Sequence, residues 1–359
     1  EVWRDASVGE TREALVRGGR AIALNILRAS DEGRRARWGE TYVARVREID
    51  RRRRGAFLDL GLQEASGFLP LGEDGRVRLG RERAALTEGG SIEVSVVREA
   101  ARGKSAVVEL RALGRDGQAP RRVARPECDE DLAQARPAEG AVRARLDAAI
   151  EDALARWAAI PGGGALSIEP TAALVAIDVD AGARAGSGDA TQFALDLNIA
   201  AASEAARQVR LRNLAGLIAI DFVSMRAKSH NAELEQAVRA AFANDPWSVQ
   251  FGGLSRFGVY ELSRAQLRTP LHEFLCDPGG RLSVETVALM ALRAIEREGA
   301  AQAGRQIACT IAPEVKAWLH AGPIEWRSAL SDRIGMRWTL DAPPAGANWP
   351  REKIDARAL

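Results

Sequence analysis

Hydrophobic and polar residues alternate with two different periods along the chain, and the change of period divides it into parts. Between residue 38 and about residue 113, apolar residues recur at every second position in short runs. These runs lie at 42–47, 55–61, 92–97 and 106–110. Alternation with a period of two predicts half-buried strands, and short strands at this spacing indicate a small closed β-barrel.

A helical period appears after a polar stretch. Residues 114–138 are rich in Arg, Pro, Asp and Gln and predict a linker. From Val142 to Trp157 the apolar residues recur at every third or fourth position, which predicts an amphipathic helix. Pro161 and the three glycines after it are expected to stop that helix.

From residue 165 the pattern becomes that of an α/β protein. Two continuous apolar runs, at 174–178 and 217–221, predict buried strands, with a long helix between them. A second helix is expected at 229–243, and strands around a Gly-rich turn at 247–262. The remaining residues, about 80, alternate between helix and strand. We therefore expect a mixed α+β protein of several domains.

The net charge alone says little about the function of the protein. The 51 Lys and Arg residues nearly cancel the 49 Asp and Glu residues, which leaves a net charge of +2. This excludes a uniformly basic polymer and an acidic tail, but a local basic patch stays open. Lysine occurs at four positions, so almost every basic residue is an arginine and a lone arginine says little about function. The four are Lys104, Lys228, Lys316 and Lys353.

Cysteine spacing and hydropathy limit the kinds of site and the cellular location that we expect. Cys128, Cys276 and Cys309 are far apart and form no Cys-x-x-Cys pair, which argues against a disulfide framework and a closed zinc site. The longest apolar run is too short to span a bilayer, and no secretory signal is visible. We expect a cytoplasmic protein that does not bind membranes.

The two predicted buried strands end in almost the same residues. Asp178 and Asp221 each follow an Ala-Ile pair, and Asp180 lies two residues beyond Asp178. If the strands are parallel neighbours, a right-handed crossover places these carboxylates at one edge of the sheet. Such a cluster is stable mainly when it is protonated or neutralised by a cation, and oxygen ligands suit Mg²⁺ or Mn²⁺. The alternative is that these aspartates cap turns or the following helix.

An aromatic residue is expected on the surface of the barrel. Phe57 shares a strand face with Asp59, whereas Leu58 points to the other face. An aromatic ring on the solvated face of a small barrel can stack on a nucleobase. The alternative is that Phe57 packs under a loop or against a neighbouring domain.

Long segments of the chain resemble the RNase E/G family of endoribonucleases. In the barrel these are GAFLDLG at 55–61 and GFLPL at 67–71. AIDVDAG at 176–182, ARQVRLRNLAGLIAIDF at 206–222 and SRFGVYELSR at 255–264 are similar to the catalytic signature of the family. The resemblance implies an OB-type, ribosomal-S1-type RNA-binding barrel, a DNase I-like α/β catalytic domain and a small C-terminal α/β domain.

The resemblance also implies how the chain is divided. The expected parts are the N-terminal strands of a reduced RNase H-like subdomain at 1–37, the OB-fold barrel at 38–113, a linker and amphipathic helix at 114–164, the DNase I-like catalytic domain at 165–275, and the small α/β domain at 276–359.

Two elements of the family are expected to be missing, which makes this a minimal form. About 60 residues separate the barrel from the catalytic strands, too few for the insertion that senses RNA 5′-monophosphate. Cys276 stands alone where the family has the cysteine pair that links two subunits through zinc. We expect no structural zinc, and a homodimer that is not linked through zinc stays open.

The family's catalytic residues can be carried over by position. Its metal-binding aspartates fall on Asp178 and Asp221, and its catalytic asparagine is Asp180 here, expected to bind the metal or to position a water. The family's RNA-contacting residues fall on Phe57, Phe68 and Lys104.

Two arginines are further candidates for RNA binding. Arg256 and Arg264 lie in the last segment of the resemblance and are candidate phosphate ligands. The alternative for each is a plain surface role.

Together these residues predict a Mg²⁺-dependent endoribonuclease, with Mn²⁺ as a substitute metal. It is expected to cleave single-stranded RNA to 5′-phosphate and 3′-hydroxyl ends, in RNA processing or decay. An ionised aspartate cannot donate a hydrogen bond as asparagine does. The alternative is therefore a catalytically weak or inactive RNA-binding or ribosome-assembly factor of the same fold.

Overall fold

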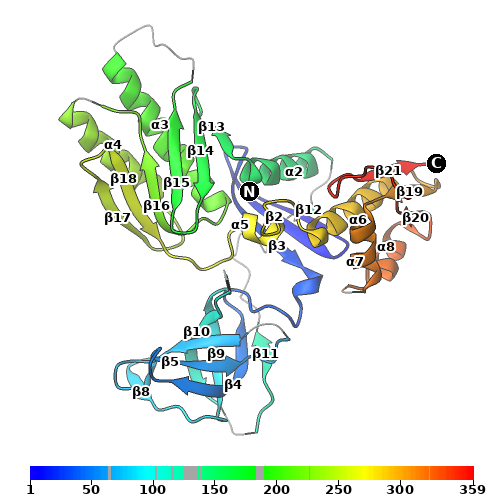
Figure 1. Ribbon diagram of the computed structural model, residues 1–359, viewed down its shortest axis with the longest axis horizontal. Helices are drawn as coiled ribbons and strands as arrows, with labels where there is room; N and C mark the ends of the chain where they lie inside the picture. Colours follow the sequence, from blue (N-terminus) through cyan, green and yellow to red (C-terminus); the bar gives the residue numbers. More distant parts are fainter. Residues whose placement is uncertain are drawn as a thin grey trace.

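Three folded units surround a central sheet in the computed structural model (Figure 1). The structure describes residues 1–359 with the exception of 64–65, 102, 115–116, 125–135, 138–139, 183–189, 226 and 323, and it describes the backbone alone of 136, 137 and 190. The expected mixed α+β architecture with a β-barrel is confirmed. Among the described residues, no helix is both long enough and apolar enough to cross a membrane.

The central sheet is formed by the N-terminal strands. These are β1 Val2–Ser7, β2 Glu10–Arg17 and β3 Arg20–Arg28, with β12 Arg136–Pro137 parallel to β1. Helix α2, Ala141–Leu154, shares a core with this sheet, in which Trp3 and Leu24 meet Leu146. The amphipathic helix that was expected to belong to the linker region therefore forms one unit with the N-terminal strands.

The barrel closes on itself. Its strands are β4 Thr41–Asp50, β5 Gly55–Asp59, β6 Ser66–Pro70, β9 Ser91–Arg98 and β10 Ala106–Leu113. The order runs β4-β5-β6-β10-β9 and returns to β4, with β6 and β10 parallel and the other pairs antiparallel. The inward positions, such as Leu58, Val94 and Val108, are fully buried. A short strand, β11 Arg121–Ala124, adds to β4 beyond the expected end of the barrel, and β7 Val77–Leu79 pairs with β8 Glu82–Ala84.

A six-stranded sheet carries the carboxylates. In spatial order its strands are β13 Trp157–Ala159, β14 Ala165–Pro170, β15 Val175–Asp180, β16 Gly216–Asp221, β18 Val259–Arg264 and β17 Val249–Leu254. Strands β15 and β16 are parallel, as expected, and helix α3, Ala190–Leu211, connects them. Helix α3 and helix α4, Lys228–Phe242, cover one face through an apolar core.

The other face of this sheet is exposed, and we call it the open face. On β15 the side chains of Val175, Ile177 and Val179 point to the helices, whereas Ala176 and Asp178 are exposed. The expectation that β15 and β16 are buried strands is therefore wrong for one side. The apolar run looked continuous because a small residue, Ala176, stands at an exposed position between two buried ones.

The expected helix also ends earlier than its apolar spacing indicated. Helix α2 stops at Leu154, and Trp157 begins strand β13 instead of lying on the helix face. Pro161 and the glycines after it form the turn of a hairpin between β13 and β14, in which Ile160 N donates to Gly164 O at 3.0 Å. Gly162–Gly164 all have positive φ, which glycine adopts at low cost.

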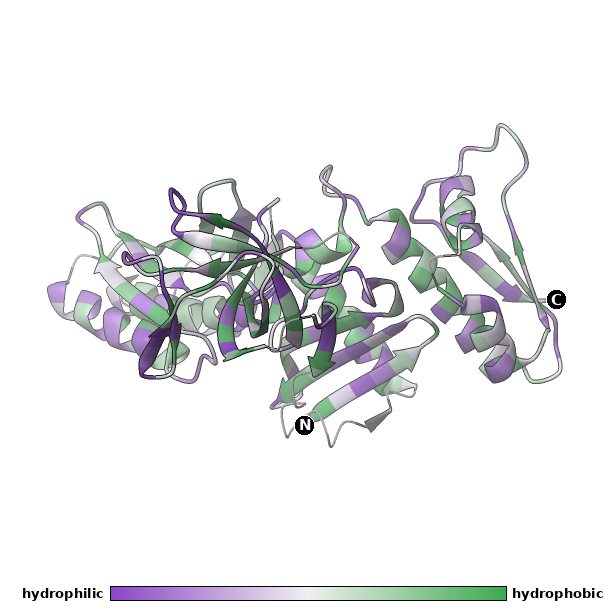
Figure 2. Ribbon diagram, turned by 90° about the horizontal axis from the view of Figure 1, so that it is seen from below, coloured by the Kyte–Doolittle hydropathy of each residue, from purple (hydrophilic) through white to green (hydrophobic). Residues whose placement is uncertain are grey.

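The C-terminal unit is a small α/β domain, as expected. It contains α6 Val284–Ala301, β19 Ile307–Thr310, α7 Pro313–His320, α8 Trp326–Ile334, β20 Trp338–Asp341 and β21 Asp355–Ala358, preceded by α5 Leu271–Leu275. Helix α6 begins at Ser283, whose hydroxyl accepts from Thr286 N at 3.2 Å. In Figure 2, green and purple bands alternate along the strands and helices, so most elements bury one side.

Candidate functional site

Asp178 and Asp221 lie side by side on the open face. They are direct register partners on the parallel strands β15 and β16, and both side chains are exposed. Neighbouring strands are about 4.8 Å apart, so two negative charges lie closer together than carboxylates prefer without a counter-ion. The pair thus concentrates negative charge at one place on the open face.

Asp180 is engaged differently. Its Oδ1 accepts from Gly182 N at 2.8 Å, so the side chain helps to shape the turn after β15. Among the residues that the structure describes, no three His, Cys, Asp or Glu side chains lie close enough together to hold a metal ion. Of the three aspartates singled out in the sequence, the strand register pairs Asp178 with Asp221, whereas Asp180, the last residue of β15, lies on the same exposed face and is the register partner of Ala165.

Asn198 fixes the backbone just beyond Asp221. This fully buried residue of α3 donates from Nδ2 to Val223 O at 2.8 Å and accepts from Val223 N at 3.0 Å. The two bonds tie the crossover helix to the segment that leaves β16 two residues after Asp221. Asn198 belongs to the stretch that resembles the family signature, between 176–182 and 206–222, but sequence reasoning assigned it no role of its own.

Phe57 and Phe68 form one aromatic feature on the barrel. They are cross-strand partners on β5 and β6, with ring centroids 5.4 Å apart and planes at 62°. Both rings are half-buried, and the Arg53 guanidinium lies 5.7 Å from the Phe57 centroid. Beneath them, Gly55 leaves room for Phe68, because a Cβ there would lie 2.1 Å from Phe68 Cζ.

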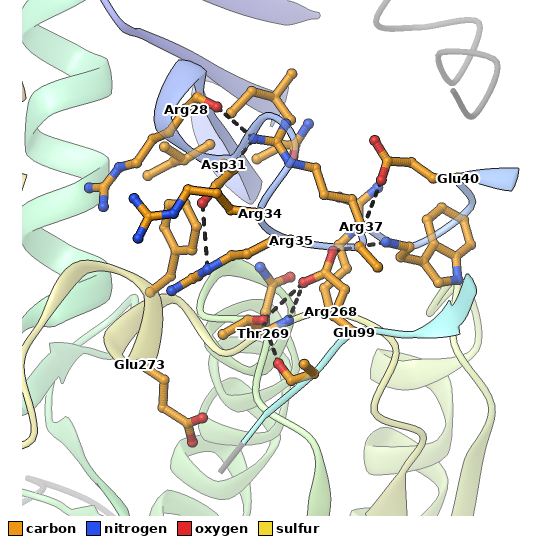
Figure 3. Close-up of a pocket in the computed structure, with 18 of the residues that line it drawn as sticks. Arg28, Asp31, Arg34, Arg35, Arg37, Glu40, Glu99, Arg268, Thr269 and Glu273 are labelled. Atoms are coloured by element: carbon orange, nitrogen blue, oxygen red, sulfur yellow. Dashed lines mark hydrogen bonds and ion pairs between the residues drawn. The ribbon is translucent and has the colours of Figure 1, made fainter. Parts of the chain in front are cut away.

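Lys104 lies at the mouth of a cleft of about 1390 Å³ between the barrel, the N-terminal sheet and α5. The Lys104 side chain is exposed in the turn before β10, and Ser105 beside it bonds Ser66 of β6 at 2.9 Å. Residues of the N-terminal sheet, the following loop and the segment before α5 form the other walls (Figure 3). Asp178 and Asp221 do not line this cleft.

Many charges of this cleft neutralise one another. Arg28 pairs with Glu10 at 2.9 Å, and Arg37 pairs with Asp31 at 3.0 Å. Glu99 of the barrel accepts from Trp38 N at 3.1 Å and from Thr269 N at 2.8 Å, two contacts that join separate segments of the chain. We interpret these contacts as a junction that holds the barrel in place.

The two candidate phosphate ligands have different surroundings. Arg256 is exposed in the turn between β17 and β18, with its guanidinium 4.7 Å from the centroid of Phe257. Arg264 is 2% exposed, pairs with Asp245 at 3.0 Å and donates to Leu214 O at 2.8 Å. Burial lowers the pKa of the Arg264 guanidinium, which Asp245 opposes. The prediction that Arg264 binds phosphate does not fit this position, because its donors serve the protein interior.

The two cysteines that the structure describes lie in different elements. Cys276 is partly exposed in the loop after α5, and Cys309 is buried in β19. Cys128 lies outside the described residues.

Comparison with known proteins connects this geometry to one family. The model of the "Ribonuclease E/G family" matches residues 118–267, which include the carboxylate pair and the β17–β18 hairpin. Ribonuclease E of Haemophilus influenzae is 34% identical over 204 residues, which cover 55% of this chain and 21% of that protein. Ribonuclease E of Escherichia coli is 34% identical over 182 residues, 49% of this chain and 17% of that protein. Ribonuclease G of Haemophilus influenzae is 31% identical over 181 residues, which cover 48% of this chain and 37% of that protein. The chain thus spans about a fifth of the ribonuclease E relatives that it matches.

Proposed function

We propose that this chain is a member of the ribonuclease E/G family and an endoribonuclease that cleaves single-stranded RNA in RNA processing or decay. The observation that carries the proposal is the pairing of Asp178 with Asp221 in register on an exposed sheet face. Both residues lie in the segment that the family model matches. The barrel adds a second, aromatic surface on the same chain.

The donor set at the carboxylate pair fits Mg²⁺, with Mn²⁺ as a substitute. Mg²⁺ is commonly bound by one or two carboxylates together with waters and substrate phosphate, so Asp178 and Asp221 suffice without a third acid. Their exposure leaves room for waters and an RNA phosphate. When bound, the metal would lower the pKa of a coordinated water and shield charge that develops on the phosphate.

The other residues of the chain bind and orient the RNA. Phe57 and Phe68 offer rings on which bases stack, a mode of binding that tolerates any sequence. Lys104 and Arg256 are exposed cations within reach of phosphates. Asp180, which shapes the turn beyond β15, binds the metal or positions a water at the same edge. Attack of a water on the phosphorus, with cleavage of its bond to the 3′-oxygen, leaves 5′-phosphate and 3′-hydroxyl ends.

Asn198 acts as a positioning residue in this proposal. Its paired hydrogen bonds with Val223 fix the backbone that follows Asp221. A fixed backbone limits how far the Asp221 carboxylate can move relative to Asp178. Preorganised ligands lose less conformational freedom when a metal or substrate binds.

The proposal is tested by incubating an unstructured RNA with the protein and Mg²⁺, and by comparing the Asp221→Asn variant. We expect cleavage to fall on the order of a hundredfold or more, because one ligand of the charge-stabilising centre is lost. Thermal stability should stay the same or rise, since one of two repelling charges is removed. Glu233→Gln, an exposed acid on α4, is the charge-matched control. Equal cleavage by the two variants, or cleavage that persists in EDTA, would refute catalysis at this pair.

A second candidate function is a catalytically weak or inactive RNA-binding or ribosome-assembly factor. The observation that favours it is Asp180, which stands where the family has an asparagine and already accepts from Gly182 N. RNA binding without cleavage, lost in Phe57→Ala, would select this candidate.

Further assignments belong to the same proposal. The barrel order β4-β5-β6-β10-β9, with one parallel pair, supports an OB-type barrel. The DNase I-like character of the six-stranded sheet, a cytoplasmic location and a homodimer without zinc rest on the family resemblance. Sedimentation of the full chain with and without a zinc chelator would test the last of these.

A further inference from the structure

Two exposed aromatic side chains lie to either side of the carboxylate pair, one on strand β13 and one in the β17–β18 turn. Phe257 is 77% exposed and Trp157 is 49% exposed, although burial of such large apolar surfaces is favourable. Figure 1 shows β13 and the β17–β18 hairpin on opposite sides of β15 and β16. One ring therefore belongs to each side of the pair.

The strand register places these features in one row across the sheet. Following the register partners from β13 to β18, the row reads Trp157, Ser167, Asp178, Asp221 and Val259. The alternation of buried residues confirms the face, because Ala158 beside Trp157 is buried in the core shared with α3 and α4. Trp157 therefore points to the same side as Asp178.

Phe257 lies at the far end of this row. Ser255 N donates to Val259 O at 2.8 Å, and Gly258 N donates to Ser255 O at 3.0 Å. These bonds form a tight turn directly beyond Val259, and Phe257 is at its tip. The hairpin thus presents an aromatic ring next to the strand end that carries Asp221.

Each ring has an arginine beside it. The Arg256 guanidinium lies 4.7 Å from the Phe257 centroid, and the Arg156 guanidinium lies 5.8 Å from a Trp157 ring centroid. Guanidinium groups next to aromatic rings hold the rings in place and add positive charge. The acidic centre of the row is thus bordered on both sides by an aromatic ring with an arginine beside it. Arg156 also forms an ion pair with Glu169, which balances the charge beside Trp157.

We propose that Trp157 and Phe257 each stack on a base of a single-stranded RNA that crosses the open face, one on either side of Asp178 and Asp221. The inference rests on the proposed function and adds a second set of base contacts, on the catalytic sheet instead of the barrel. A neutral ring attracts a base without a phosphate contact, which is useful beside carboxylates that repel phosphates.

The distance between the two rings sets the length of RNA that is held. Strands β13 and β18 are separated by four inter-strand intervals of about 4.8 Å, or about 19 Å in total. Stacked nucleotides rise about 3.4 Å each, so the two bases are separated by several nucleotides in the strand. The phosphate over the carboxylate pair lies between them.

The binding experiment uses the full chain and short single-stranded RNAs that carry one 5-iodouridine at successive positions. EDTA is present, so that metal-dependent cleavage cannot remove the probe. After irradiation, mass spectrometry locates the crosslinked peptides. We expect crosslinks to Phe257 and to Trp157 from two different positions of the RNA, separated by several nucleotides.

Variants give an independent measure of the same contacts. Phe257→Leu and Trp157→Leu keep an apolar side chain without a ring, and each is expected to weaken RNA binding about tenfold. Phe257→Tyr and Trp157→Phe should bind nearly as the parent does. Met336→Ala is the control, because Met336 is 84% exposed in the C-terminal domain. Circular dichroism confirms that each variant is folded.

The outcomes separate this inference from the nuclease proposal. Crosslinks at both rings without any cleavage in Mg²⁺ would support base stacking and refute the nuclease. Normal cleavage with unchanged RNA affinity in both Leu variants, and no crosslink to either ring, would overturn base stacking. Base stacking would also be overturned if the Leu variants changed the sedimentation of the protein and not its RNA affinity. The two rings would then contact a second copy of the chain.

Discussion

Two arginines eight positions apart show how much the surroundings of a residue decide its role. Arg256 and Arg264 both belong to the β17–β18 hairpin, but one is exposed and the other is 2% exposed. Arg264 pairs with Asp245 and lies 3.9 Å from a Trp247 ring centroid, so its charge is used inside the fold. Removing one member of a buried pair leaves the other charge without compensation.

We predict that Arg264→Met destabilises the protein by about 3 kcal/mol, because Asp245 is left buried with only the more distant Arg210, at 3.9 Å, to balance its charge. Arg256→Met should change the free energy of unfolding by less than about 0.5 kcal/mol. Urea denaturation measures both. The effects on RNA affinity should be reversed. Arg256→Met should bind RNA more weakly than the parent protein, and folded Arg264→Met should bind RNA with unchanged affinity. A loss of affinity in folded Arg264→Met would contradict the structural role.

The sequence could not separate these two arginines. Both stand in a segment with the same family resemblance, and arginine is common throughout the chain. Burial of Arg264 depends on Asp245 in the loop after α4, a partner that tertiary packing supplies. Asp178 and Asp221 were easier to pair, since a parallel crossover between similar strands brings the strand ends together.

At the scale of an element, the first residue of strand β5 determines the geometry of the aromatic surface of the barrel. Gly55 opens β5 opposite Pro70, and its missing side chain leaves space for the Phe68 ring. That ring then meets Phe57 edge to face. A backbone position thereby controls the geometry of two side chains that we propose to bind RNA.

We predict that Gly55→Ala weakens the binding of short single-stranded RNA several-fold, because the new Cβ pushes the Phe68 ring away from Phe57. Fluorescence anisotropy with a labelled RNA measures the affinity. In a Phe68→Ala background the same Gly55→Ala change should have no further effect. An equal loss of affinity in both backgrounds would show that the glycine acts on the barrel by another route.

Strand and helix patterns predicted most elements but not their partners. The barrel strands were visible because alternation with a period of two is local. Trp157 was assigned to a helix because it continues the spacing of α2 by coincidence, whereas its pairing with Ser167 across a Gly-rich turn is a contact that spacing does not encode. The open face was hidden for a similar reason, since Ala176 is apolar but small enough to be exposed.

At the scale of the whole molecule, a few buried polar contacts join the units. Arg207 of α3 donates to Ala21 O at 2.8 Å and pairs with Asp152 of α2 at 2.8 Å, which ties the six-stranded sheet and its helices to the N-terminal sheet. Glu99 performs the corresponding task for the barrel. The distance between the aromatic surface of the barrel and the carboxylate pair depends on both.

We predict that Glu99→Ala loosens the barrel relative to the rest of the chain, because Trp38 N and Thr269 N lose their acceptor. Small-angle scattering should show a larger radius of gyration, and proteolysis near the barrel should accelerate. Glu88→Ala is the control, since Glu88 bonds Ile49 N within the barrel. RNA cleavage should fall more in Glu99→Ala than binding to the barrel does. Equal scattering from both variants would assign no orienting role to Glu99.

The barrel and the six-stranded sheet differ in whether they have edge strands. The barrel closes through β4 and β9, whereas the six-stranded sheet ends in β13 and β17. Exposed strand edges invite pairing with other chains, and short or irregular edge strands reduce that risk. Strand β13 has three residues, and the register of β17 shifts between Phe251 and Gly253. Both edges are thus poor templates for aggregation, so the sheet can keep one face uncovered at high concentration without growing into fibrils.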